Sequence, residues 1–196
     1  MIRSEGELVL RGDNDAFLSD VISDVILLFF KTKSIVDAIR RKEFDDGSYY
    51  CLIGAMVGVE REKEKEYLKT IVGDMTVASV KGIHDFILTE MRETWDDLVK
   101  LCKKLYAQCG GNEDVVALAV FLMGTSDKTY SRVRVIENGN IVSECGDKIE
   151  RPVPFFGTFE RDFLFTISAL HPDYICVESR DAIPERILRI IRAMGC

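Results

Sequence analysis

Apolar residues recur every three or four positions in the first two thirds of the chain, which is the period of an α-helix with one buried face. The first such series follows Asp13, Asn14 and Asp15, any of which can cap a helix, and it comprises Phe17, Leu18, Val21, Ile22, Val25, Ile26 and Phe29. A second helix is expected from about Ser34, with Gly47 ending it. Residues 7–10 are read as a short strand or an irregular lead-in.

A long helix is expected over residues 83–105. Its apolar stripe is formed by Ile83, Phe86, Ile87, Met91, Trp95, Leu98, Cys102 and Leu105. We therefore predict that Trp95 is buried and that His84 lies at the edge of the same face. The glutamates and lysines of residues 60–69 alternate in sign, and this pattern predicts an exposed helical face with short-range ion pairs.

After residue 128 the hydrophobic period changes from that of a helix to that of strands. Asn138-Gly139 separates two β-rich runs and predicts a two-residue type I′ hairpin that pairs Val135 with Val142. A helix over 159–170, a short strand over 174–177 and a helix after Pro184 follow. His171-Pro172 ends the first of these helices, because the residue before proline avoids the helical region.

These elements predict an α+β fold, in which an N-terminal multi-helix region is followed by a small β-β-α-β-α sheet layer. The helical region is expected over 13–124 and the small α/β region over 128–196, with both belonging to one compact unit. A chain of 196 residues that is 47% hydrophobic is long enough for such a core.

The formal net charge of −7 argues against bulk electrostatic binding to nucleic acid or anionic lipid. The longest apolar run, VILLFF, is far shorter than the roughly 20 residues of a membrane span, and no signal sequence is recognised. The six cysteines contain no C-x-x-C pair and are interpreted as reduced thiols. We expect a cytoplasmic protein without a cofactor.

No residue is assigned as catalytic, cofactor-binding or metal-binding. There are only two histidines, no phosphate-binding loop follows Gly54 and Gly58, and no nucleophile motif is found. Adjacent residues on a helix diverge by about 100°, so His84 and Asp85 are not expected to pair. The candidates that remain for a ligand or partner site are His84, Trp95, Arg132, Arg134 and His171. Trp95 is mainly interpreted as a core residue, and the two histidines mainly as structural residues.

Three stretches resemble the sporulation proteins of the YtxC type from endospore-forming Firmicutes. AFLSDVISDVILLFFKTKSIVDAIRRKEF is similar to the paired N-terminal helices of the family, and KGIHDFILTEMRETWDDLVKL to its long helix. The block from VRVIENGNIV through FLFTISALHPDYICVES to ERILRIIRAMGC is similar to its terminal hairpin, helix, strand and helix. The resemblance covers about residues 16–196. It implies a cytoplasmic protein connected with sporulation and carries over no catalytic residue.

The function expected from the sequence is that of a non-enzymatic interaction protein with a protein partner, and a homo-oligomer stays open. The alternative is an enzyme or small-ligand-binding protein with its site between the helical and α/β parts. Neither reading involves a membrane or nucleic acid.

Overall fold

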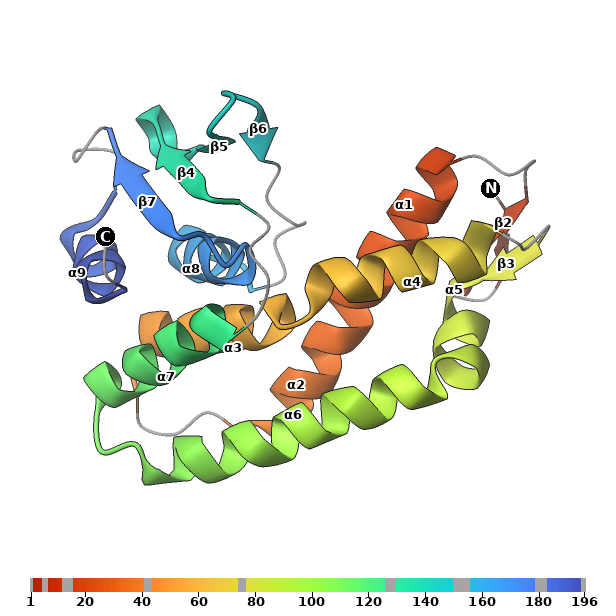
Figure 1. The fold of residues 1–196 in the computed structure, drawn as a ribbon, viewed down its shortest axis with the longest axis horizontal. Helices are drawn as coiled ribbons and strands as arrows, with labels where there is room; N and C mark the ends of the chain where they lie inside the picture. The colour runs from red at the N-terminus through yellow and green to blue at the C-terminus, as the bar shows by residue number, and fades with distance from the viewer. Residues whose placement is uncertain are drawn as a thin grey trace. The chain divides into compact units, whose positions relative to one another are not determined.

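The computed structural model describes residues 2–4, 7–11, 16–40, 44–73, 77–125, 130–149, 156–178 and 183–194. The chain divides into two compact units, each built from two separate stretches (Figure 1). Unit 1 comprises Met1–Ile39 and Glu60–Leu101, and unit 2 comprises Arg40–Val59 and Cys102–Cys196.

Unit 1 is helical apart from a three-stranded antiparallel sheet. Its sheet has the order β1-β2-β3, formed by Ile2–Ser4, Glu7–Arg11 and Val77–Ser79. Its helical elements are α1 (Ala16–Val25), the π-helix η1 (Ile26–Lys31), α2 (Thr32–Ala38), α4 (Arg61–Gly73), α5 (Val80–Gly82), the π-helix η2 (Ile83–Ile87) and most of α6 (Thr89–Gln108). Of the two alternatives for residues 7–10, a short strand or an irregular lead-in, the structure has the strand, β2.

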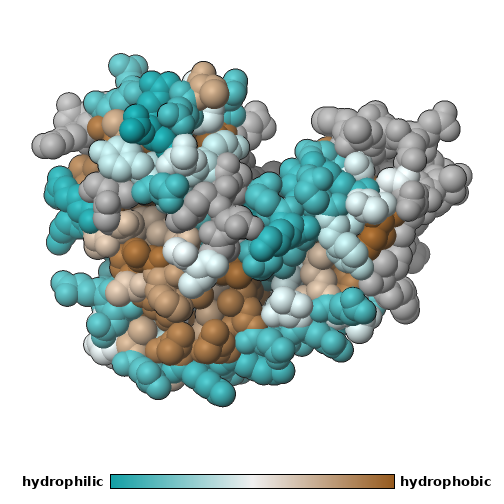
Figure 2. Space-filling view, viewed as in Figure 1, coloured by the Kyte–Doolittle hydropathy of each residue, from teal (hydrophilic) through white to brown (hydrophobic). Residues whose placement is uncertain are grey.

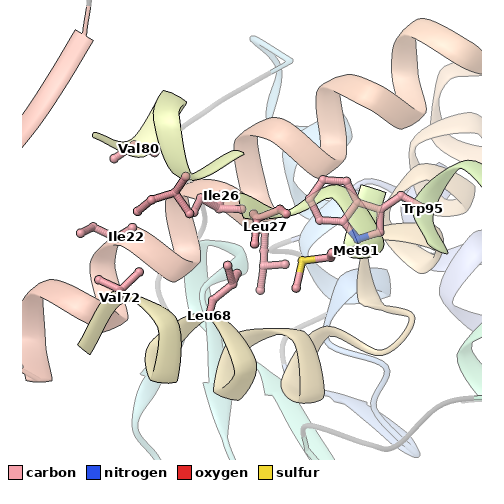
Figure 3. Packing of buried hydrophobic residues seen from close by; sticks show 10 residues of the cluster. Ile22, Ile26, Leu27, Leu68, Val72, Val80, Met91 and Trp95 are labelled. Carbon is pink, nitrogen blue, oxygen red and sulfur yellow. The ribbon is translucent and has the colours of Figure 1, made fainter. Parts of the chain in front are cut away.

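The core of unit 1 is an apolar cluster contributed by η1 and the helices around it (Figure 3). It contains Ile22, Ile26, Leu27, Leu68, Val72, Val80, Ile83, Leu88, Met91 and Trp95. The predicted stripe is thus confirmed at Ile83, Met91 and Trp95. The helix expected over 83–105 is not continuous, however. A π turn ends at Leu88, whose N–H donates to the carbonyl of Ile83, and α6 begins after it.

Unit 2 packs helices on a four-stranded sheet. The helices are α3 (Asp46–Gly58), α7 (Asn112–Thr125), α8 (Phe159–Ala169) and α9 (Glu185–Ala193), together with the last residues of α6. The strands β4 (Arg132–Val135), β5 (Ile141–Ser143), β6 (Lys148–Ile149) and β7 (Tyr174–Val177) have the order β6-β5-β4-β7. The β4–β7 pair is parallel, with α8 between these strands in the chain, and the other pairs are antiparallel.

Glycines allow α3 to approach α8 closely. A Cβ atom built on Gly54 would lie 2.3 Å from the backbone oxygen of Phe165, and one on Gly58 would lie 2.3 Å from His171 Nε2. Both helices are apolar on the faces that meet, so contact between their backbones buries both faces. In α3, Gly47 lies in the first turn instead of ending a preceding helix, which corrects the prediction for this residue.

Helix α7 is apolar on nearly all sides and packs against α3. Its outward side still leaves Phe121 59% exposed. Apolar surface is visible over α7 in Figure 2.

The predicted hairpin is present, but its turn and register are wrong by one residue. Val135 pairs with Ile141 and Val133 with Ser143. The loop has three residues, with Gly139 N–H donating to the carbonyl of Ile136 and with Gly139 at φ +67°. This is a type I turn followed by a left-handed residue, an alternative that the same Asn-Gly dipeptide also permits.

The α+β class and the N-terminal helical region are confirmed. The division into compact units does not coincide with the predicted regions 13–124 and 128–196, because α3 and α7 belong to the same unit as the four-stranded sheet. Both helices are apolar on most sides, and they bury this surface against α8 and each other. No helix in the described part of the chain has both the length and the apolar character needed to cross a bilayer.

Candidate functional site

A cleft of about 330 Å³ opens beside His84 and lies wholly within unit 1. Phe30 from η1, His84 from η2 and Trp95 from α6 give it an aromatic wall. Its charged lining is contributed by Lys33, Asp37, Lys81, Asp85, Arg92 and Asp96. The structure thereby brings together two of the five residues that the sequence singled out, His84 and Trp95.

The imidazole of His84 lies nearly parallel to two neighbouring aromatic rings. It stacks on Phe30 with the ring centroids 4.3 Å apart and an interplanar angle of 19°. The centroid of the Trp95 ring lies 6.4 Å from that of His84, with an interplanar angle of 28°. The His84 side chain is only 17% exposed, so the stacking fixes its plane while leaving an edge accessible from the cleft.

His84 also pairs with its neighbour, contrary to the prediction. His84 Nδ1 lies 2.8 Å from Asp85 Oδ1. The two residues lie in a π turn, where i→i+5 bonding puts more residues into each turn and so brings adjacent side chains closer in angle than in an α-helix. An ionised carboxylate can only accept a hydrogen bond, so Nδ1 carries the proton.

Lys81 completes a chain of polar contacts along this wall. Its Nζ donates to Asp85 Oδ2 at 2.8 Å. This hydrogen bond lowers the pKa of Asp85 below its ordinary value, and the contact with His84 lowers it further. Asp85 is therefore ionised near neutral pH and orients the imidazole, with Nε2 left as the acceptor in the neutral ring.

A buried polar network supports the cleft from within the core. Trp95 Nε1 donates to Glu64 Oε1 at 2.8 Å, and Lys31 Nζ donates to Glu64 Oε2 at 2.7 Å. Lys31 has no exposed surface. Burial lowers the pKa of Lys31, and the adjacent Glu64 carboxylate opposes this shift. One carboxylate thus satisfies both an indole and an ammonium group, and it fixes the Trp95 ring against which His84 lies.

Sequence reasoning missed Glu64 and Lys31. The Glu/Lys run was predicted to be exposed, and Glu64 is the residue that breaks this prediction. Other residues of the run do behave as predicted, since Lys63 pairs with Glu60 and Lys69 with Glu66. Glu64 lies three residues after Arg61 and four residues before Leu68. Leu68 is buried, and residues four apart share one face of a helix, so this spacing was the available signal that Glu64 points inward.

The charges around the cleft are balanced, with three basic and three acidic residues. Lys81 and Asp85 are paired with each other. The side chains of Lys33, Asp37 and Asp96 form no ion pair or hydrogen bond with a described residue. The guanidinium of Arg92 makes only a 3.5 Å contact with the carbonyl of Asp85. The rim therefore offers charges of both signs to a ligand.

Arg132 and Arg134 lie apart from this cleft, on β4 of unit 2. The guanidinium of Arg132 lies 5.3 Å from the ring centroid of Tyr174, and Arg134 Nη1 pairs with Glu178 Oε1 at 2.8 Å. Both arginines are engaged by neighbours from the β7 side of the sheet, and neither lines a cavity with His84.

His171 has a structural role in unit 2. It is 1% exposed, and its Nε2 lies 2.7 Å from the carbonyl oxygen of Ala55, in the last turn of α3. The carbonyl that the His171 ring contacts belongs to α3, and not to α8, the helix that His171 follows. His171 has a φ of +46°, and its ring lies directly beside Gly58.

No cluster of three His, Cys, Asp or Glu side chains within the described ranges could hold a metal ion. Burial raises the pKa of the Cys51 thiol to about 11, and it raises that of Cys102 to about 11 as well. At neutral pH both groups are protonated thiols, the form that neither attacks electrophiles nor binds metals.

The chain matches no protein-family model, no curated protein and no solved structure.

Proposed function

We propose that the protein is a cytoplasmic interaction protein that binds a protein partner through the cleft beside His84. The observation that carries the proposal is the composition of this cleft. Its aromatic wall is held in place by the hydrogen bond between Trp95 and Glu64, and it is surrounded by unpaired charges of both signs. Aromatic and arginine side chains are the residue types that most often dominate binding energy at protein interfaces. The preorganised His84–Trp95 stack would lose little conformational entropy on binding.

The balanced rim supports a protein partner over a nucleic acid. Lys33 and Arg92 are matched by Asp37 and Asp96, which would repel a phosphate backbone. A polypeptide segment that carries both an acidic and a basic side chain would satisfy both sets. The resemblance to sporulation proteins of the YtxC type adds the proposal that the partner is produced in sporulating cells. A second copy of the chain is one candidate for this partner.

Photo-crosslinking can test the cleft with a matched control. A photoreactive amino acid would replace Asp96, which lines the cleft, or Asp97, the adjacent exposed aspartate on α6 that does not. We expect one discrete adduct from position 96 in sporulating cells and none from position 97. Equal adducts from both positions, or none from either, would contradict the proposal. The mass of the adduct would distinguish a different protein from a second copy.

A second candidate function is supported by the 2.8 Å contact between Asp85 and His84. A carboxylate that orients an imidazole is an arrangement used for general acid–base catalysis. Ser34 lines the same cleft but makes no described hydrogen bond to His84. If the protein is an enzyme that uses this base, His84→Gln should abolish turnover without changing the melting temperature, whereas an interaction role predicts weaker binding of the crosslinked partner.

A further inference from the structure

A second cavity, of about 440 Å³, lies within unit 2 where α3, α7 and α9 meet. Apolar side chains from two helices form part of its lining, namely Val116 of α7 and Ile190 and Ala193 of α9. Its volume falls within the range of about 300–1,000 Å³ that is common for small-ligand sites. None of the candidate residues from the sequence lines it.

Several polar groups of the cavity are already used by the protein itself. Asp45 caps α3 by accepting a hydrogen bond from Ser48 N–H at 2.8 Å, and its Oδ1 lies 3.6 Å from Arg186 Nη2. Arg186 Nε also pairs with Glu160 Oε1 at 3.3 Å. Asp45 and Arg186 therefore neutralise each other and hold α9 against the start of α3.

Three polar groups remain without partners among the described residues. Arg189 of α9 and Glu113 of α7 both line the cavity, yet they form no ion pair with each other or with any other described group. Asn112 accepts the N–H of Asp45 through Oδ1 at 2.9 Å, which fixes the orientation of its amide. Its NH₂ group has no described acceptor. The cavity thus presents one unpaired cation, one unpaired carboxylate and one amide donor beside an apolar lining.

We propose that this cavity binds a free amino acid with an apolar side chain. The guanidinium of Arg189 can hold the α-carboxylate in two parallel hydrogen bonds, with the Asn112 amide as an additional donor. Glu113 accepts from the α-ammonium group, and the lining around Val116 and Ile190 accepts the apolar side chain. Asp45 and Glu113 disfavour a phosphate or another multiply charged anion, so the site selects a ligand that carries both charges.

Calorimetric titration of the full chain with L-alanine, L-leucine and L-phenylalanine tests this site. We expect at least one of them to bind with one-to-one stoichiometry. The matching amino-acid amide lacks the carboxylate and the N-acetyl derivative lacks the positive charge, so each should bind at least about tenfold more weakly. These comparisons use the unaltered protein and do not depend on the folding of a variant.

Two variants locate the binding. Arg189→Gln and Glu113→Gln should each weaken binding by about tenfold or more, while Arg192→Gln should leave it unchanged, because Arg192 lies on the same helix, pairs with Glu185 and does not line the cavity. Absence of binding for all three amino acids would overturn the proposal. Equal binding of the N-acetyl derivative, or unchanged binding by Arg189→Gln, would overturn it as well.

Discussion

The two units differ in how their buried interiors are packed and how the polar groups inside them are satisfied. Unit 1 buries a charged pair, since Lys31 and Glu64 lie within the core and share their contact with the Trp95 indole. Unit 2 instead brings two helix backbones close together at Gly54 and satisfies the end of α3 with the imidazole of His171. One interior depends on electrostatic compensation, whereas the other depends on the absence of side-chain volume.

This contrast predicts different weaknesses. A buried ion pair is costly to assemble, and removing one member leaves an uncompensated charge. A close backbone contact tolerates changes of charge at a distance, but it cannot accept one additional carbon atom. Each unit should therefore be most sensitive to a substitution that the other would tolerate.

The largest effect is expected from Lys31→Met. It leaves the Glu64 carboxylate buried without its cation, and the expected loss in the free energy of unfolding is about 3–5 kcal/mol. Chemical denaturation followed by Trp95 fluorescence measures it, because Trp95 is the only tryptophan and lies in unit 1. The exposed Lys63 on α4 provides the control, and Lys63→Met should cost less than about 1 kcal/mol.

Combining Lys31→Met with Glu64→Gln sharpens this test. Glutamine removes the buried charge and keeps an acceptor for the Trp95 N–H, so the double variant should be more stable than Lys31→Met alone. If the losses of the single variants Lys31→Met and Glu64→Gln simply add in the double variant, the Lys31–Glu64 interaction is not the cause of the destabilisation.

The corresponding test of unit 2 is Gly54→Ala. The new Cβ atom would meet the backbone oxygen of Phe165, which has no rotamer with which to move away, and a loss of about 3 kcal/mol is expected. Gly124 of α7 has no atom within 4 Å of such a Cβ. Gly124→Ala should therefore stabilise the protein by about 0.5–1 kcal/mol, since alanine favours the helix. Similar destabilisation by both substitutions, measured by thermal denaturation, would refute the close-contact explanation.

Trp95→Phe isolates the hydrogen bond between the indole and Glu64. Phenylalanine keeps an aromatic ring but donates no hydrogen bond to the carboxylate, and the expected loss is about 1.5–3 kcal/mol. In the unaltered protein, Trp95 is 1% exposed, so iodide should quench its fluorescence only weakly. Strong quenching in the native protein would show that Trp95 is not in the core.

The smallest effect is expected from Lys81→Gln at the cleft. Lys81 is the main cause of the lowered pKa of Asp85, so this pKa should rise toward its ordinary value of 3.8, as measured by carboxyl NMR titration. A folded-state pKa below the unfolded value stabilises the protein above about pH 3.8, and this contribution is lost as the pH falls through the folded pKa. The variant should thus lose less stability on acidification than the unaltered protein. An unchanged Asp85 titration would exclude the Lys81 contact in solution.

Local periodicity was sufficient to predict much of the fold. The burial of Met91, Trp95 and Cys102 follows from their spacing on one helix, because side chains three or four residues apart share a face. The strand at Tyr174–Val177 and the helix at Phe159–Ala169 were also predicted from local sequence signals. These elements depend on neighbours in the chain, which a sequence displays directly.

The errors came from interactions between distant residues or from ambiguous local ones. Glu64 is buried because Lys31 lies 33 residues earlier and faces it, and nothing within its own helix indicates this partner. The hairpin register was missed because Asn-Gly fits both a two-residue and a three-residue loop. Two residues of the candidate site, His84 and Trp95, were identified from the sequence. The stacking of His84 was not, because it depends on where Phe30 lies in the fold.

The π turns at Ile26–Lys31 and Ile83–Ile87 have a consequence for changes in chain length. A π turn holds one residue more than an α-helix needs over the same span. Deleting a residue from the first turn would restore a regular α-helix and leave the residues after it on nearly the same face, whereas a deletion in α1 before the turn would rotate them by about 100° relative to the start of α1. Lys31 would then point away from Glu64. Among natural relatives of this chain, a one-residue gap in α1 should accordingly coincide with the replacement of both charged residues, whereas a one-residue gap within the π turn should leave them in place.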